Sequence, residues 1–434
     1  MISSIVIASL TCISLVLCVL FKPRIKIKTF EFQTFWVVSL IGALLLLILR
    51  ILPFNVLFDN LLEDSVVNPF KILILFICLS MISITLDCLG FFKYLAVKVA
   101  NKFNKSQYYL FFSLYILIAL LTMFTSNDIV ILTFTPFICY FAKNAKISPI
   151  PFLVMQFIVA NTYSMALYIG NPTNIYLSQA SNVNFLEYLK VMWLPTLFAG
   201  ITSLVLLLFV FRKQLSQKIV VSSCEEVKIE HKLLTGVSLS ILLICTFMLA
   251  ISNYINIEMW LICLLCAFVL SLILGIVSLC KGKKLLGDVY KRLPYNLIFF
   301  VLAMYTIVLS LEYNDVTVKI AEGVSRIATT KYSQALVYGS SSIVFDNLIN
   351  NIPMSILFSS IVQLNFSQVA LYAVIIGSNI GAYLTPVGAL AGIMWMSILK
   401  KQEINYSFVQ FVKYGVLFVP VILIASLVGL LIVL

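Results

Sequence analysis

Long apolar runs recur along almost the whole chain, and they constrain the fold more than any other feature. Runs of about 20 apolar residues can cross the hydrocarbon core of a bilayer as helices. The 434 residues are 62% hydrophobic and 11% charged, which leaves too few polar residues to cover a water-soluble core. The sequence therefore predicts an all-α polytopic membrane protein with about ten spanning helices.

The basic residues are placed in the short gaps between the apolar runs. A net charge of +12 could suggest a nucleic-acid partner, but charge in such gaps carries orientation information. Most of the 29 lysines and arginines fall in gaps that alternate with poorly charged ones, beginning with residues 22–28. This pattern predicts a multi-pass protein of the cell membrane, of the bacterial inner-membrane type, with the lipid bilayer as a partner and no nucleic acid.

Two apolar stretches are interrupted where a spanning helix should be continuous. Residues 376–393 contain several glycines, Pro386 and polar side chains, and residues 166–175 are a weaker copy. Backbone that leaves the helix at membrane depth is tolerated only where it is buried in protein or lines a wet cavity. The interruptions therefore predict two broken helices that meet at a binding site.

Each interruption is preceded by an apolar segment that is too long for one helix and has a polar middle. Such segments predict two re-entrant hairpins, and an odd number of crossings before the second half makes the halves inverted repeats. The predicted organisation is a first repeat at 1–211 with hairpin 108–142 and broken helix 152–178, a cytoplasmic linker at 212–232, and a second repeat at 233–434 with hairpin 332–362 and broken helix 369–399.

Amide and hydroxyl side chains gather at the hairpin tips and the helix breaks. Free amide groups of half-helix ends favour anions and free carbonyls favour cations, and asparagine both donates and accepts. A purely structural role in helix packing is the alternative for each of them. The predicted substrate-binding residues are Asn127, Gly170, Asn171, Thr173, Asn174, Asn350, Asn351, Asn379, Thr385 and Gly388.

Two acidic residues lie within the predicted hairpins. An ionisable group at membrane depth is costly and usually functional, so Asp128 and Asp346 are the predicted sites of ion or proton coupling. The alternative is that neighbouring amides satisfy them at the hairpin tips. Asp87 lies near a helix end, where we expect it to face water.

Several chemistries have no support in the sequence. It contains no glycine-rich phosphate loop ending in lysine and serine or threonine, no Gly-x-Ser-x-Gly elbow and no His-Glu-x-x-His pair. Cys263 and Cys266 lie inside an apolar helix and are interpreted as packing residues. We therefore predict no enzyme activity, no catalytic residue, no cofactor and no metal site.

Five motifs can be compared with known families: Tyr295-Asn-Leu-Ile-Phe-Phe, Asn350-Asn-Ile-Pro353, Gly377-Ser-Asn-Ile-Gly381 and Leu384-Thr-Pro-Val-Gly388 in the second half, and Asn127-Asp128 in the first. With these motifs the chain resembles, over nearly its whole length, the arsenical pump membrane protein family of the ion transporter superfamily. The resemblance implies extrusion of arsenite or antimonite in exchange for protons. It also implies a homodimer, and in some systems a soluble ATPase subunit.

The leading hypothesis is a secondary active transporter of a small anion or metalloid, of the arsenite and antimonite efflux type and coupled to protons. A dicarboxylate or citrate-like symporter and a sodium/proton antiporter are alternatives within transport. A passive channel is the alternative from another class, and it would conduct with no coupling ion.

Overall fold

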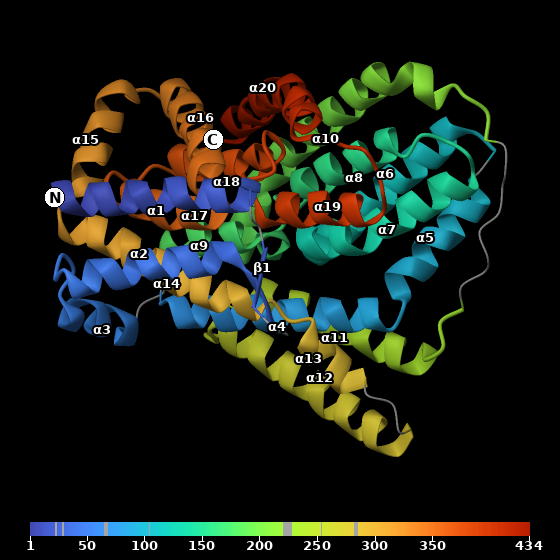
Figure 1. Cartoon of the computed structure of the whole chain (residues 1–434), viewed down its shortest axis with the longest axis horizontal. Coiled ribbons are helices and arrows are strands. Elements are labelled where there is room, and N and C mark those ends of the chain that lie inside the picture. Colours follow the sequence, from blue (N-terminus) through green and yellow to red (C-terminus); the bar gives the residue numbers. More distant parts are fainter. Residues whose placement is uncertain are drawn as a thin grey trace.

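The chain folds almost entirely into helices that lie along one long axis of the molecule (Figure 1). The structure is a computed structural model, and it describes residues 1–21, 24–27, 30–64, 68–103, 105–219, 228–252, 254–281 and 285–434. In this part of the chain, seven helices are long and apolar enough to span a membrane, and further shorter apolar helices lie among them.

The described residues of the first half form ten α-helices. They are α1 (Ile2–Phe21), α2 (Thr34–Ile48), α3 (Phe54–Leu62), α4 (Pro69–Cys88), α5 (Phe91–Lys102), α6 (Gln107–Phe124), α7 (Asn127–Asn144), α8 (Ile150–Tyr163), α9 (Pro172–Ala180) and α10 (Phe185–Leu215). A short 3-10 turn, η1 (Tyr168–Gly170), lies between α8 and α9.

The second half repeats this order. Its helices are α11 (Lys232–Ile251), α12 (Met259–Lys281), α13 (Leu285–Lys291), α14 (Tyr295–Tyr313), α15 (Val316–Ile327), α16 (Lys331–Ile349), α17 (Asn351–Leu364), α18 (Gln368–Ile380), α19 (Leu390–Lys401) and α20 (Phe408–Val433). The turn η2 (Gly381–Tyr383) lies between α18 and α19, as η1 does in the first half.

The helix contacts follow the same symmetry. Helices whose numbers differ by ten are equivalent in the two halves. The contact of α2 with α14 corresponds to that of α12 with α4, and the contact of α7 with α19 corresponds to that of α17 with α9. The helices α10 and α20 pack on each other and so map onto their own contact. This exchange symmetry is what two inverted repeats produce.

Local sequence explains where the broken elements start and stop. The side chain of Ser126 accepts from the backbone N–H of Asp128 and starts α7, and that of Asn171 accepts from Thr173 N and starts α9 just before Pro172. Serine and asparagine are good N-caps, and proline fits the first helical turn. The hairpin and the break are therefore encoded locally.

The prediction of an all-α polytopic membrane protein is confirmed, with one addition. Two short strands, β1 (Arg24–Ile27) and β2 (Phe30–Gln33), pair antiparallel with Arg24 opposite Gln33. Strand β1 lies within the basic gap at 22–28, where no strand was predicted. The repeat boundaries remain predictions: α10 continues to Leu215, α11 begins at Lys232, and residues 220–227 of the predicted linker lie outside the described residues.

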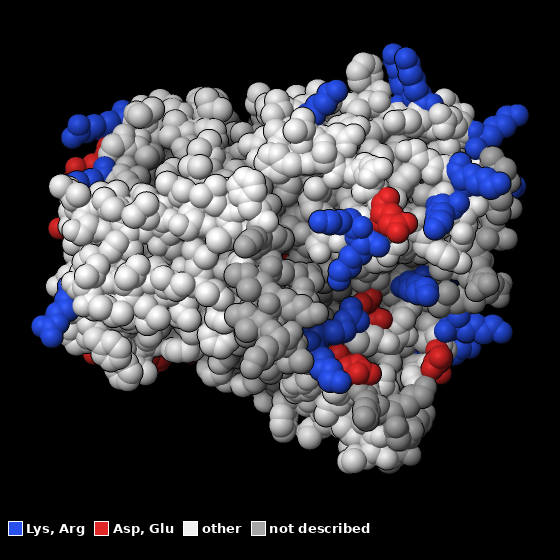
Figure 2. Space-filling model, in the orientation of Figure 1, with Lys and Arg blue, Asp and Glu red and all other residues white. Residues whose placement is uncertain are grey.

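Charged side chains gather toward the two ends of the long axis and leave an uncharged band between them (Figure 2). Lysines and arginines dominate the end that holds α5 and α13, which the sequence predicts to be cytoplasmic. The opposite end holds α3 and the amphipathic helix α15. The band has the composition of a surface that faces lipid.

Candidate functional site

The tip of the first hairpin is joined to α8 by buried amide groups. Asn127 Nδ2 donates to Asn161 Oδ1 at 3.0 Å, and Asn161 Nδ2 donates to the carbonyl of Phe157 at 2.8 Å. Deeper in the hairpin, Thr135 donates to Gln156 Oε1 at 3.1 Å. Buried polar groups need such partners, so this hairpin is fixed to the first broken helix.

The first helix break contacts the second broken helix directly. Asn171 Nδ2 donates to Asn379 Oδ1 at 3.0 Å, and Asn379 Nδ2 donates to Asn174 Oδ1 at 2.8 Å. The hydroxyls of Thr173 and Ser378 lie 3.2 Å apart. The residues from both halves thus converge as the sequence predicts.

The amide of Asn379 is fully used by these contacts. Its Nδ2 also donates to the carbonyl of Ile375 at 2.8 Å, and its Oδ1 lies 2.8 Å from the hydroxyl of Ser164 as well as near Asn171. A primary amide has two donor hydrogens and two acceptor lone pairs. In this conformation Asn379 has no hydrogen-bonding capacity left for a solute, and its hydrogen bonds instead hold the two halves together.

Close internal contacts of Asn174 and Gly170 also fill the first break. Asn174 Nδ2 donates to the backbone carbonyls of Ser164 and Leu167, at 2.8 and 3.4 Å. A Cβ at Gly170 would lie only 2.2 Å from the Ser164 carbonyl oxygen. Gly170 therefore permits a close approach of backbone to backbone, and it is placed for packing in this conformation.

Hydrogen bonds join the second break to the tip of the second hairpin. Thr385 donates to Asn347 Oδ1 at 2.7 Å, Asn350 Nδ2 donates to the carbonyl of Val387 at 2.9 Å, and Asn351 N donates to the carbonyl of Gly388 at 3.1 Å. Asn350 has a φ of 78°, which non-glycine residues rarely adopt. The tip is thus held in a strained conformation by its contacts with the break.

Asp346 lies one turn before this tip and is fully buried. Among the described residues, neither of its carboxylate oxygens has a hydrogen-bond partner. A Cβ at Gly381 would lie 2.6 Å from Asp346 Oδ2, so the carboxyl group faces the start of the second break. Burying a carboxyl group without a hydrogen-bond partner is costly, so Asp346 destabilises this conformation.

Asp128 has a different environment, because it borders a cavity of about 400 Å³. The lining comes from both halves: Ser126 and Asp128 of the first hairpin, Phe76 and Ser80 of α4, residues 291–297 before and in α14, Leu390, Ile393, Met394 and Ser397 of α19, and Gln33. Lys291 and Arg292 are exposed at its edge. The cavity therefore reaches the surface at the basic, predicted cytoplasmic end.

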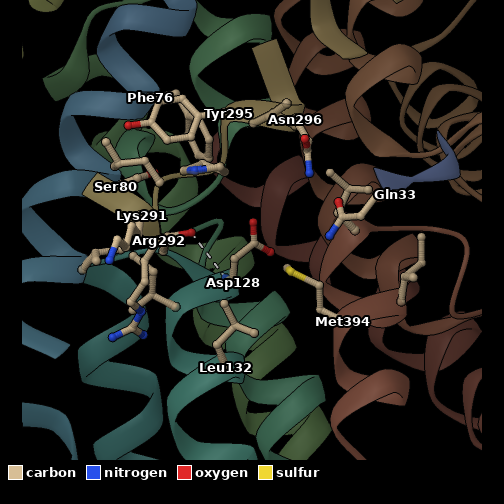
Figure 3. A pocket seen from close by; sticks show the side chains of 18 of the residues that line it. Gln33, Phe76, Ser80, Asp128, Leu132, Lys291, Arg292, Tyr295, Asn296 and Met394 are labelled. Atoms are coloured by element: carbon tan, nitrogen blue, oxygen red, sulfur yellow. Dashed lines mark hydrogen bonds between the residues drawn. The ribbon is translucent and has the colours of Figure 1, made fainter. Parts of the chain in front are cut away.

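The carboxyl group of Asp128 points into the middle of this cavity, toward Asn296, Gln33 and Met394 (Figure 3). The charged ends of Lys291 and Arg292 point away from it. The Arg292 guanidinium instead pairs with the carboxylate of Asp87, which also accepts from Thr133 Oγ1 at 2.6 Å. Asp87 was expected to face water; that prediction was wrong, because it links α4, α7 and the α14 entrance.

The structure thus divides the predicted residues into three groups. Asp128 lines the cavity. The second group forms or adjoins a closed contact between the two halves, which we call the seam: Asn127, Gly170, Asn171, Thr173, Asn174 and Asn379. The third group forms a closed junction between the second hairpin and its break: Asn350, Asn351, Thr385, Gly388 and Asp346. None of the second and third groups borders the cavity.

Several residues of the cavity and of the buried amide contacts were not predicted from the sequence. Asn161 and Asn379 stand at the same distance from Gly170 and Gly388 respectively, a repeat signal that could have found Asn161. Asn296 follows Pro294 at the start of a spanning helix, where an amide is unusual. Ser80 and Ser397 carried no signal beyond a hydroxyl on an apolar helix.

Comparisons with known proteins agree on a transporter. A family profile described as "Citrate transporter" matches residues 29–364. The arsenical pump membrane protein of Escherichia coli K12 is 26% identical over 372 residues, covering 82% of this chain and 84% of the relative. A putative arsenical pump membrane protein of Bacillus subtilis is 25% identical over 373 residues, covering 80% and 83%.

A solved structure supports the fold. The YdaH transporter of Alcanivorax borkumensis, whose crystal structure is described as having an unusual topology, aligns with a TM-score of 0.57 and 11% identity. The alignment covers 99% of this chain and 98% of that one. At this identity the likeness concerns the fold alone.

Proposed function

The chain belongs to the citrate transporter family and is a membrane anion transporter of the cell membrane, and we propose that it is a secondary active transporter that exports a small oxyanion or metalloid hydroxide in exchange for protons. The resemblance to the arsenical pump membrane protein family is confirmed by the curated relatives. Arsenite and antimonite are therefore the substrates proposed.

One observation carries the proposal: among the described residues that line the cavity, Asp128 is the one with a carboxyl group, and the cavity reaches the basic end of the molecule. The equivalent region of the other half is sealed, since residues 173–180 of α9 are all buried. A binding space that is open at one end and closed at the other is what alternating access requires. A continuous pore would support a channel instead.

The roles of the residues follow from their places. Asp128 can exchange a proton with water in the cavity, while Ser80, Asn296 and Ser397 offer hydroxyl and amide groups to a small solute. Asp346 is the second proposed coupling site and would ionise only after the second hairpin separates from its break. The amide seam would open in that same step, which would free Asn171, Asn174 and Asn379 to bind the solute as predicted.

The family description favours one competing substrate, citrate, and the basic residues at the cavity edge would attract such an anion. A dicarboxylate is the related alternative. A homodimer and an optional soluble ATPase subunit remain proposals that come from the resemblance alone. The family is one of transporters, and no enzyme activity is proposed.

Counterflow in proteoliposomes tests the function. Purified protein would be reconstituted with arsenite, antimonite, citrate, a dicarboxylate or sodium inside, each with and without a pH gradient. We expect arsenite or antimonite exchange that a proton gradient drives. Flux of citrate with no metalloid flux would identify the competing substrate, and conductance without a coupling ion would identify a channel.

A further inference from the structure

A second cavity lies within the uncharged band and is lined almost entirely by apolar side chains. It has a volume of about 500 Å³ and lies between α1, α14, α15 and the second hairpin. We call it the α1 groove. Its lining residues are Ile5, Ala8, Ser9, Cys12, Ile13, Val16, Leu17, Met304, Ile307, Val308, Leu311, Val316, Ile320, Phe345, Leu348, Ile349 and Leu357.

The α1 groove is open on its outer side and closed at its floor. Ile13 and Leu17 on α1 are 57% and 49% exposed, and Leu348 on the second hairpin is 52% exposed. Met304 and Ile307 at the floor are buried. Ile13 and Leu17 lie on the apolar helix α1, and no charged residue is among the described residues that line the groove. The opening is therefore suited to the bilayer and not to bulk water.

We propose that the α1 groove holds an acyl chain of a membrane phospholipid. Water does not fill an apolar cavity that lacks hydrogen-bond partners, and an empty groove would forfeit the packing contacts of its walls. The hydrocarbon beside the opening is the material that can enter at no hydrophobic cost, since lipid tails are as apolar as the leucines and isoleucines they would touch.

The end of the groove supplies a place for the headgroup. Val316 and Ile320 of α15 line the groove, and the exposed Lys319 lies between them in the sequence. Helix α15 is strongly amphipathic and lies at the poorly basic end of the molecule, where an interfacial helix is expected. A lysine there can contact a lipid phosphate while the chain extends along α1.

The site would connect lipid to the second hairpin. Phe345, Leu348 and Ile349 precede the hairpin tip at Asn350, whereas the facing wall belongs to α1 and α14. An acyl chain would therefore fill the space between the hairpin and helices outside it. This binding does not depend on the proposed substrate or coupling.

Photo-crosslinking tests the proposal directly. The full chain would be reconstituted with phosphatidylglycerol or phosphatidylcholine that carries a diazirine in the acyl chain, irradiated, and digested for mass spectrometry. We expect adducts concentrated on residues 5–17 and 345–349. Adducts spread evenly over all exposed apolar helices would overturn the site.

Variants separate the groove from the general lipid-facing surface. Ala8→Trp fills the groove and should abolish those adducts, and Ala8→Leu should lower them. Leu10→Trp, on the exposed face of α1 outside the groove, should retain them. Size-exclusion profiles and thermal unfolding would confirm folding of each variant.

Two further outcomes are informative. Lys319→Gln should lower the adduct yield with phosphatidylglycerol more than with phosphatidylcholine, because the former has a net negative headgroup. If a second copy of the chain covers the groove, irradiation will give no lipid adducts there and Ala8→Trp will disrupt a dimer, and the proposal fails.

Discussion

The two hairpins of this protein occupy equivalent places in their repeats but have opposite environments. The first hairpin, with α19 beside it, borders an open cavity that contains Asp128. The second hairpin, with α9 beside it, has its tip closed against the second break, and its acid Asp346 has no hydrogen-bond partner among the described residues. Two halves with one topology thus have two conformations, which is the asymmetry that alternating access exchanges.

Side-chain size explains part of this difference. Gly377 on α18 and Gly381 at the start of η2 allow α16 to approach closely, and an added Cβ at Gly377 would lie 1.8 Å from Ser342 Oγ. The positions that match them in the repeat alignment, Val159 and Tyr163 on α8, are larger. Tyr163 stands against Tyr115 of α6 in an edge-to-face contact at 5.9 Å. Small residues therefore let α16 pack closely on α18, whereas the larger Val159 and the Tyr163–Tyr115 pair occupy the corresponding space in the first half.

The largest expected effect comes from removing the acid that distinguishes the open half. Asp128→Asn keeps the shape of the side chain but cannot release a proton. Stimulation of transport by a pH gradient should fall by about 5- to 150-fold, the range of coupling free energies between sites. Uptake into proteoliposomes at fixed solute and varied pH gradient measures this effect.

The matched control is Asp288→Asn, an exposed acid near the same end that does not border the cavity. It should leave the stimulation unchanged. Full stimulation in Asp128→Asn would remove this residue from the coupling mechanism.

Breaking the seam between the halves should have the next largest effect. Asn379→Ala removes the hydrogen-bond partner of Asn171 Nδ2 and that of Asn174 Oδ1, and each buried group left unsatisfied costs about 1–3 kcal/mol. Thermal unfolding in detergent should show a clear loss of stability. Asn161→Ala, at the equivalent position of α8, removes contacts only within the first half and should cost less; equal losses would contradict a special role for the seam.

The third test adds a methyl group where α16 and α18 pack most closely. Gly377→Ala should lower the free energy of unfolding by about 1–3 kcal/mol, because the added methyl must displace Ser342 and approach the Gly339 carbonyl. Gly236→Ala on α11, which has no atom within 4 Å of the added Cβ, should be neutral or slightly stabilising. Similar behaviour of both variants would show that close packing does not seat the second hairpin.

The smallest effect is expected at the cavity edge. Arg292→Gln removes the pair with Asp87, but Arg292 is 44% exposed, and pairs of this kind contribute about 0–1 kcal/mol. Stability should change little. The apparent affinity for an anionic solute should decrease, since a positive charge is lost near the entrance, and an unchanged affinity in uptake assays would exclude attraction at this edge.

Much of the architecture could be predicted from the sequence because the relevant signals are local. Apolar runs of membrane length, the polar tip at Ser126, and Asn171 with Pro172 each specify where a helix starts or stops. The meeting of Asn171 with Asn379 was also predictable, since broken helices at membrane depth need each other's polar groups.

The division into open and sealed regions could not be predicted in this way. The sequence predicts Asn379 to be a solute ligand, and only its hydrogen-bond partners in the structure show that its amide is saturated in this conformation. Asp128 and Asp346 likewise look equivalent until their surroundings are known. Whether Asp128 or Asp346 borders the cavity depends on how each hairpin packs against the rest of the protein, and those contacts are long-range.

The central claim is that the two halves exchange conformations during transport, and site-directed labelling tests it most directly. Ser397 on α19 borders the cavity, and its repeat counterpart Gln179 on α9 is buried. Each would be replaced by cysteine in a background without the ten native cysteines and treated with a maleimide in membranes. We predict that Ser397→Cys is labelled and Gln179→Cys is protected at rest, and that solute with an opposing proton gradient reverses both. Labelling that stays the same at both positions, or changes in the same direction, would contradict the account.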